Sequence, residues 1–284
     1  MIAIESGAFR LVASPAAGGS IAALDWHGQP MLRAGSGTDV LNSACFPLVP
    51  FSNRIAGSRF RFDGREVVLQ PNHPDDRSEP VLHGHGWQRP WTVTAHQPDR
   101  LALALDLPAR DWPWPFLAEQ TFTLEQSSAA LTLSIANRGD TPMPAGLGFH
   151  PYFHRTATTL LIARHLSEWQ VDGACLPTTL DARDTAIDWW AGQPVASRTV
   201  DTVYTARQGD LTILWPERRL GLTMAPDDSL PCTTIYVPAG ADYFCVEPVS
   251  HMTDAVNRAP EQMRVLAPGQ RWQATLRLTP FRTP

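Results

Sequence analysis

Apolar and polar residues alternate along much of the 284-residue chain. Strict alternation over four to eight residues is the pattern of a β-strand with one buried face. It occurs at 59–63, 120–125, 131–136 and 272–278. Shorter apolar runs rich in β-forming residues lie at 101–107, 211–215, 220–224, 234–237 and 244–246. We therefore expect many short strands.

Turn-forming residues separate these segments, for example Asp63-Gly64, Gly139-Asp140 and Ala239-Gly240. Long helical periodicity is nearly absent, and 26 prolines would interrupt most helices. Many short strands with frequent turns favour a sandwich or barrel. The stretch 160–200 is less regular, and we interpret it as loops between strands. No repeat or linker divides the chain, so the prediction is one all-β domain over residues 1–284 with few short helices.

Composition narrows the classes of partner. The 23 basic and 28 acidic residues give a net charge of -5, and neither sign forms a long block. Nucleic acid and anionic membranes are therefore not expected as partners. Four scattered cysteines contain no Cys-x-x-Cys pair, and the N-terminus resembles no signal peptide. We expect a cytoplasmic protein that binds a small, largely uncharged molecule.

The segment Gly-Phe-His-Pro-Tyr-Phe at 148–153 places the imidazole of His150 among aromatic rings, including that of Tyr152. Such rings can stack on the apolar face of a sugar, and a histidine can move a proton near neutral pH. A buried imidazole that only forms hydrogen bonds with the backbone would be compatible with the same sequence pattern. The aromatic frame favours a functional role.

Four other polar residues beside strand-like segments are candidates for chemistry or binding. Glu247 follows the apolar run 243–246, where burial would raise its pKa towards that of a general base, although a salt bridge would also explain it. Asn53 and Arg54 offer hydrogen-bond donors for hydroxyl groups or a carboxylate. Asp201 could accept hydrogen bonds from a sugar or cap a turn.

His83 and His85 are two residues apart, so on a strand both rings would face one side, as ligands do in a β-sheet metal site. The flanking glycines also allow a turn, in which the rings would diverge. The segment that follows contains no glutamate to complete a metal site. We therefore expect no metal.

Four motifs in this order resemble those of the aldose 1-epimerase (mutarotase) family. They are Asn53-Arg54-Ile55 with the hairpin around Asp63-Gly64, Leu82-His83-Gly84, the His-Pro-Tyr-Phe run at 150–153, and Cys-Val-Glu at 245–247 with Asp254 to Asn257. The resemblance runs across nearly the whole chain. It implies a single-domain β-supersandwich, no cofactor, a monosaccharide substrate, and a monomer or homodimer.

By position, the resemblance implies that Glu247 is the general base at the C1 hydroxyl and His150 the general acid at the ring oxygen. His83, Asp201 and Arg54, with Asn53 and Tyr152 in the same motifs, would hold the sugar. The chain departs from the galactose-type branch at His83 to Trp87, where that branch has a double glycine, and at Glu247-Pro248. Galactose specificity is therefore not implied.

Three other functions fit the same residues. Arg54, Arg89 and Arg155 could favour an anionic sugar, as in hexose-phosphate epimerases. Asp201 and Glu247 could form the carboxyl pair of a glycoside hydrolase. A non-catalytic carbohydrate-binding protein would explain the tryptophans and the β architecture without a need for Glu247 and His150.

Overall fold

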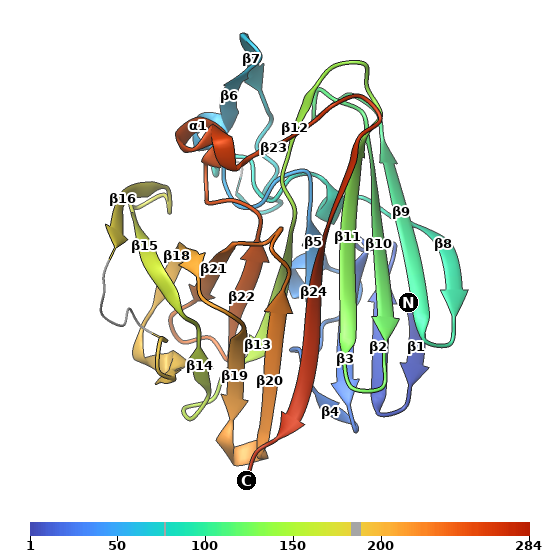
Figure 1. Ribbon diagram of the computed structural model, residues 1–284, viewed down its shortest axis with the longest axis vertical. Helices are drawn as coiled ribbons and strands as arrows, with labels where there is room; N and C mark the ends of the chain where they lie inside the picture. Colours follow the sequence, from blue (N-terminus) through green and yellow to red (C-terminus); the bar gives the residue numbers. More distant parts are fainter. Residues whose placement is uncertain (77, 183–188) are drawn as a thin grey trace.

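A computed structural model describes residues 1–76, 78–182 and 189–284. Two large antiparallel sheets form two layers (Figure 1). In spatial order, the first sheet consists of β1 (Ile2–Ser6), β2 (Phe9–Ser14), β3 (Ser20–Trp26), β5 (Cys45–Leu48), β13 (Gly148–His154), β22 (Tyr243–Val249), β21 (Cys232–Val237), β18 (Val200–Arg207), β15 (His165–Val171) and β16 (Pro177–Ala182), with β4 (Gln29–Pro30) beside β3.

The second sheet has nine strands and carries most of the alternating segments of the sequence. In spatial order they are β17 (Gln193–Pro194), β14 (Leu160–Ile162), β19 (Leu211–Trp215), β20 (Leu220–Pro226), β24 (Arg271–Arg282), β11 (Ala129–Asn137), β10 (Phe116–Leu124), β9 (Arg100–Leu107) and β8 (Thr92–Gln97). In β10, buried and partly exposed residues alternate without a break. The all-β prediction is confirmed.

Two pairs of short strands and a few short helices complete the described part of the chain. One pair is the hairpin of β6 (Arg59–Phe62) and β7 (Arg65–Val68), and the other joins two strands distant in the chain, β12 (Met143–Ala145) and β23 (Arg264–Leu266). The helices are α1 (Ala255–Arg258) and the 3-10 turns η1 (Val40–Asn42), η2 (Ala56–Ser58), η3 (Gly86–Gln88), η4 (Val195–Ser197), η5 (Pro216–Arg218) and η6 (Pro260–Gln262). Among the described residues, no helix has the length and apolar character needed to span a bilayer.

The prediction of loops over 160–200 was wrong where the structure describes it. This stretch holds β14, β15, β16 and β17, while 183–188 lie outside the described residues. The strands lack the alternating signal because they lie near sheet edges, and β16 exposes most of its residues. A solvated edge strand needs no apolar face.

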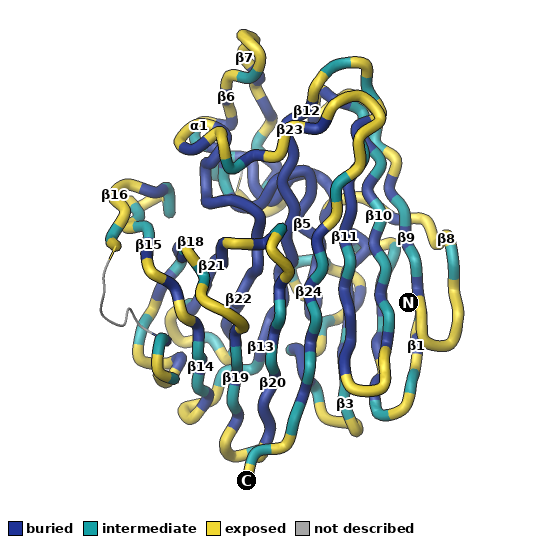
Figure 2. Tube along the Cα trace, viewed as in Figure 1, coloured by how far each residue is buried: buried dark blue, intermediate teal, exposed yellow. Residues whose placement is uncertain are grey.

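The main core lies between the two sheets. Phe153 of β13 contacts Phe244 of β22 and Trp215 of β19, which belongs to the second sheet. Because side chains alternate along a strand, the neighbours His150 and Tyr152 project from the opposite face of β13. They are nevertheless buried, as are all central residues of β13 and β22 (Figure 2). Loops that cover this outer face of the first sheet therefore enclose the functional groups.

Candidate functional site

The way the strands of the first sheet pair brings together the residues that form the floor of a cavity on its outer face. The pairs Gly148↔Val249 and Tyr152↔Cys245 bring His150 of β13 opposite Glu247 of β22. The next row continues from Cys245 to Tyr236 of β21 and on to Asp201 of β18. Residues distant in sequence thus occupy two adjacent rows that cross four strands.

The cavity has a volume of about 250 Å³. All seven residues predicted from the sequence line it, and so do five that sequence reasoning did not select. The predicted ones are Asn53, Arg54, His83, His150, Tyr152, Asp201 and Glu247, and the others are Leu41, His73, Leu82, Tyr236 and Tyr243. Leu82 belongs to one of the four motifs but was not chosen as a site residue, whereas the other four lack a local motif and only the fold brings them here.

His150 and Glu247 form a buried acid and base pair. Their Nε2 and Oε1 atoms lie 3.4 Å apart, and the Glu247 side chain is only 3% exposed. Burial raises the pKa of Glu247 well above its usual value, and nearby Asp201 raises it further, while Arg54 opposes the shift. Burial also lowers the pKa of His150 to about 3, and Arg33 adds to this effect. Each group therefore favours its neutral form.

Two further atoms of this pair are available for a ligand. Within the described structure, Glu247 Oε2 and His150 Nδ1 are buried without a hydrogen-bond partner. Buried polar atoms are usually bonded, so an unbonded pair in a cavity is typical of a functional site. Phe46 stacks on the imidazole with ring centroids 4.3 Å apart, and Tyr152 stacks at 4.7 Å. These rings fix the plane of His150.

His83 is held in one tautomer by the loop that carries Asn53. The backbone N–H of Asn53 donates to His83 Nδ1 at 3.1 Å, and the backbone N–H of His83 donates to the Asn53 carbonyl at 3.0 Å. Burial lowers the pKa of His83 well below 6.5, and His150 and Arg54 contribute to this shift. A neutral His83 that accepts at Nδ1 must carry its proton on Nε2. His83 can therefore donate a hydrogen bond.

His83 and His85 diverge, as the turn interpretation required. His83 and Gly84 both have positive φ, at 58° and 68°, which reverses the chain between the two histidines. His85 instead lines a separate cavity of about 90 Å³ with Arg89 and Asp111. The two rings thus belong to different cavities and do not form the paired metal site considered above.

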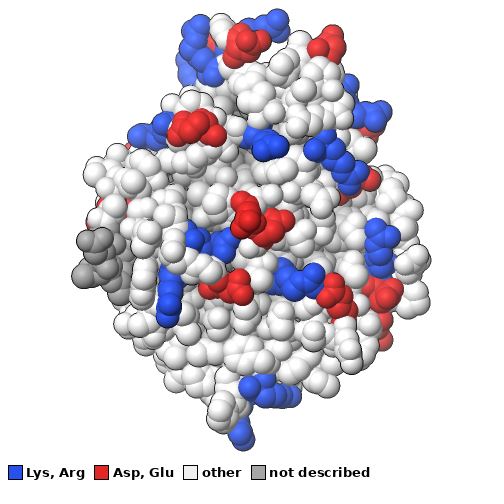
Figure 3. Space-filling model, in the orientation of Figure 1, with Lys and Arg blue, Asp and Glu red and all other residues white. Residues whose placement is uncertain are grey.

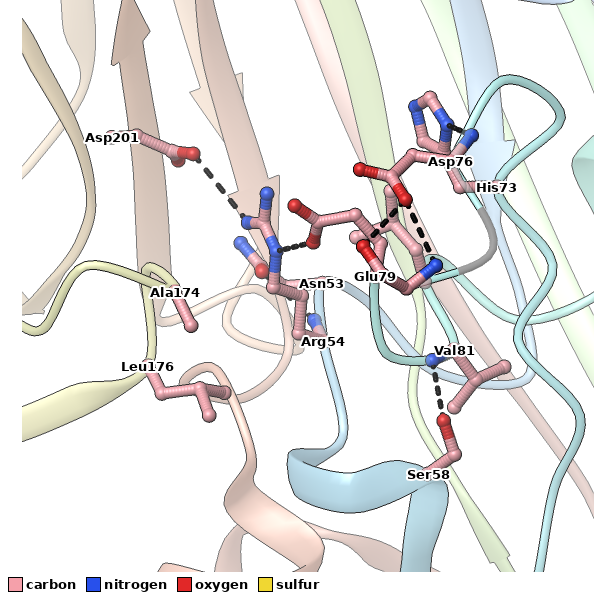
Figure 4. A network of polar contacts seen from close by, with 12 residues as sticks. Asn53, Arg54, Ser58, His73, Asp76, Glu79, Val81, Ala174, Leu176 and Asp201 are labelled. Carbon is pink, nitrogen blue, oxygen red and sulfur yellow. Dashed lines mark hydrogen bonds and ion pairs between the residues drawn. The ribbon is translucent and has the colours of Figure 1, made fainter.

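Arg54 links two carboxylates above the cavity floor (Figure 4). Its Nε donates to Glu79 Oε2 at 3.1 Å, and its Nη1 donates to Asp201 Oδ2 at 3.4 Å. The guanidinium is 15% exposed, and these two acids raise its pKa although burial opposes the rise. Asp254 supports the same loop by accepting from the backbone N–H of Ala56. Glu79 was not predicted because it lies in a polar loop without a motif.

One trio of side chains in the described part of the chain could group around a metal ion. Ligand atoms of His150, Cys245 and Glu247 lie within 4.8 Å of one another. Metals bind the thiolate, however, and burial together with Glu247 raises the pKa of Cys245 well above 9. These residues fit proton transfer better than a resident metal ion.

Comparison with known proteins shows the family of the chain. A family model described as Aldose 1-epimerase matches residues 1–279. The chain belongs to the aldose 1-epimerase family. The resemblance noted in the sequence is thereby confirmed.

Relatives of this aldose 1-epimerase family member span most of its length. The uncharacterised protein YphB of Escherichia coli K12 is 34% identical over 259 residues, which are 85% of each chain. A crystal structure of a candidate aldose 1-epimerase from Escherichia coli K12 has a TM-score of 0.92 and 29% identity, and covers 99% of this chain and 98% of its own. The aldose epimerase homologue from C. elegans has a TM-score of 0.83 with 19% identity, and the alignment covers 100% of this chain and 99% of that one. The last comparison shows the fold alone.

Proposed function

We propose that the protein is an aldose 1-epimerase that interconverts the α and β anomers of a free aldose. The observation that supports this most is the buried contact between His150 and Glu247 at the base of a sugar-sized cavity. Ring opening requires that one proton be removed and another supplied. One acid and one base in contact match that requirement.

In the ionised arrangement, the Glu247 carboxylate takes the proton from the C1 hydroxyl, and the oxygen electrons form the C1 carbonyl. The bond between C1 and the ring oxygen breaks, its electron pair stays on that oxygen, and His150 Nε2 supplies the proton. Rotation about the C1–C2 bond exposes the other carbonyl face. Reclosure returns both protons and gives the opposite anomer.

The neutral pair and the ion pair contain the same number of protons. They differ only by transfer of one proton between Glu247 and His150, so a catalytic cycle needs no net exchange with solvent. Polar groups of the sugar can bond to the free atoms of the pair and stabilise its charged form. His83 Nε2–H, Arg54 and Asp201 would hold the hydroxyl groups.

The charges around the cavity favour a neutral aldose over a sugar phosphate. Arg54 is already paired with Asp201 and Glu79. Arg89 pairs with Asp111 beside the separate cavity, and Arg155 donates to the carbonyl of Pro238. Arg54 and Arg89 therefore offer no uncompensated charge to the site, and Arg155 lines a different hollow. A phosphate would therefore have to displace an existing partner.

The decisive experiment is exchange NMR between anomers of neutral, deoxy and phosphorylated aldoses, with wild type and Glu247→Gln. We expect wild type to accelerate exchange of a neutral aldose, and the variant to lose about 10²- to 10⁴-fold of that acceleration because it lacks the base. Full activity in the variant would refute the mechanism. Release of reducing ends from a glycoside would instead identify a hydrolase, and binding without exchange a carbohydrate-binding protein.

A further inference from the structure

The charged side chains around Arg54 do not balance one another. Its guanidinium contacts the carboxylates of Asp201 and Glu79, so one positive charge lies between two negative charges (Figure 4). One carboxylate would be enough to compensate the guanidinium. The group as a whole therefore carries an excess of one negative charge beside the cavity.

Glu79 is the outermost side chain of this group. It is 34% exposed, against 25% for Asp201 and 15% for Arg54. Glu79 does not line the cavity, so it contacts Arg54 and not a bound sugar. The exposed Asp76 lies on the same polar loop, where its carboxylate accepts from the backbone N–H and the hydroxyl of Ser78 (Figure 4). Two acidic side chains thus face solvent on the Arg54 side of the cavity.

Arg33 is a further cation near the cavity, but it does not line it. Its guanidinium lies over the rings of Tyr152 and Tyr243, with Cζ 4.5 and 4.4 Å from the two ring centroids. Both rings line the cavity. Arg33 therefore lies outside the wall that a ligand touches.

The backbone holds Glu79 beside Arg54. Arg54 and Leu82 form an isolated antiparallel bridge. The buried Asn72 side chain donates to the Leu82 carbonyl at 2.8 Å and accepts from the Leu82 backbone N–H at 2.7 Å. Asn72 and Leu82 lie on either side of Glu79 in the chain. The fold therefore places this carboxylate next to the guanidinium.

Stability does not explain the second carboxylate. A partly exposed ion pair contributes only about 0–1 kcal/mol to the free energy of unfolding. A negative charge in excess does affect ligands, because it repels anions that approach the site. Like charges placed in this way suppress the binding of wrong partners.

We propose that Glu79 makes the site selective for uncharged aldoses, because it occupies Arg54 and repels sugars that carry a carboxylate or a phosphate group. The inference rests on the proposed epimerase function and assigns a residue that determines its substrate range. Glu79 acts through Arg54 and through its charge, without contact with the sugar. Removal of that charge should therefore favour anionic sugars over neutral ones.

Glu79→Gln tests the proposal, because glutamine keeps the size of the side chain and an acceptor for Arg54 Nε but removes the charge. Exchange NMR would give kcat/KM for glucose and galactose, and for the anionic sugars glucuronate, galacturonate and glucose 6-phosphate. We expect the ratio of anionic to neutral kcat/KM to rise about three- to tenfold, as for one charge a few ångströms away in a watery environment. Glu119→Gln is the matched control, because Glu119 is 33% exposed and pairs with Arg271 on the second sheet.

The wild-type protein provides a second measurement. Salt screens the repulsion between exposed charges, and the Debye length falls from about 30 Å at 0.01 M to about 8 Å at 0.15 M ionic strength. The kcat/KM for glucuronate relative to that for glucose should therefore rise with salt in wild type. It should change less in Glu79→Gln.

The outcomes separate the two proposals. An equal ratio in wild type and Glu79→Gln, or an equal gain in both variants, overturns the role of Glu79 and leaves the epimerase in place. A wild-type ratio that falls or stays constant with salt does the same. Failure of wild type to accelerate any sugar overturns the epimerase and this inference with it. If thermal denaturation shows that Glu79→Gln is unfolded, the salt dependence of wild type decides alone.

Discussion

At the scale of one residue, Glu247 shows that a side chain placed for chemistry can lower the stability of the fold. Its carboxyl group is buried beside Asp201, and within the described structure its Oε2 atom has no hydrogen-bond partner. The raised pKa means that the folded protein keeps a proton that the unfolded chain releases above about pH 4.3. Because of Glu247, the free energy of unfolding therefore decreases as the pH rises above that value.

Glu247→Gln should consequently stabilise the protein while it removes most of the proposed activity. We expect a gain of about 1–2 kcal/mol in the free energy of unfolding near pH 8 and a smaller gain near pH 4.5, where the unfolded carboxyl group is also protonated. Urea denaturation at both pH values measures it. Glu66→Gln, a change at an exposed hairpin residue, is the control. A gain independent of pH would contradict this account.

At the scale of the element, the reversed loop at His83 and Gly84 positions a binding group through backbone geometry. A Cβ atom at Gly84 would lie 2.2 Å from the carbonyl oxygen of Val49. That oxygen accepts from the backbone N–H groups of His85 and Gly86, each at 3.0 Å. The loop can therefore approach the Val49 segment only because residue 84 has no side chain.

Gly84→Ala should destabilise the protein by at least about 2 kcal/mol and reduce turnover, since both the clash and the positive φ oppose it. Gly64→Ala separates the two effects. Gly64 has a φ of 74° but open space around its Cβ position, so only the backbone strain applies, and about 1 kcal/mol is expected. Equal losses in chemical denaturation would show that the contact with Val49 is unimportant.

Strands were predictable where one face meets the core and the other meets solvent. β10 and β24 show this alternation, and their pattern is visible in the sequence. In β13 and β22 both faces are buried, so the alternation disappears. The motifs revealed the polar residues there, but strand register, a long-range property, sets their contacts. Tyr236 could not be found for that reason, and Glu79 could not be found because it lies in a polar loop without a motif.

The whole molecule buries five histidines in their neutral form. Burial lowers the pKa of His150 and His165 to about 3 and that of His85 and His251 to about 4, and it holds the pKa of His83 well below 6.5. In the unfolded chain each would accept a proton below about pH 6.5. Charged groups of both signs are interspersed on the visible surface, where solvent screens them (Figure 3). Acid sensitivity should therefore come mainly from the interior.

We expect the free energy of unfolding to fall steeply as the pH drops from about 6.5 to 4.5. Each buried histidine contributes about 1.4 kcal/mol per pH unit over the range between its folded and unfolded pKa values. His165 lies outside the site cavity. His165→Asn should lower the number of protons taken up on unfolding by about one, and so reduce the slope of the unfolding free energy against pH. His27→Asn, at an exposed position, should leave it unchanged. Urea denaturation at stepped pH values tests both variants.

The pairing of β13 with β22 has a consequence for refolding. The acid and the base lie opposite each other only in one alignment of strands that are about a hundred positions apart in the chain, and a slip of one residue would turn one of them towards the other face. A compact but misaligned molecule could keep its β content and still be inert. The activity recovered after refolding would then measure the fraction of molecules with the correct alignment. Circular dichroism cannot distinguish these molecules from misaligned ones.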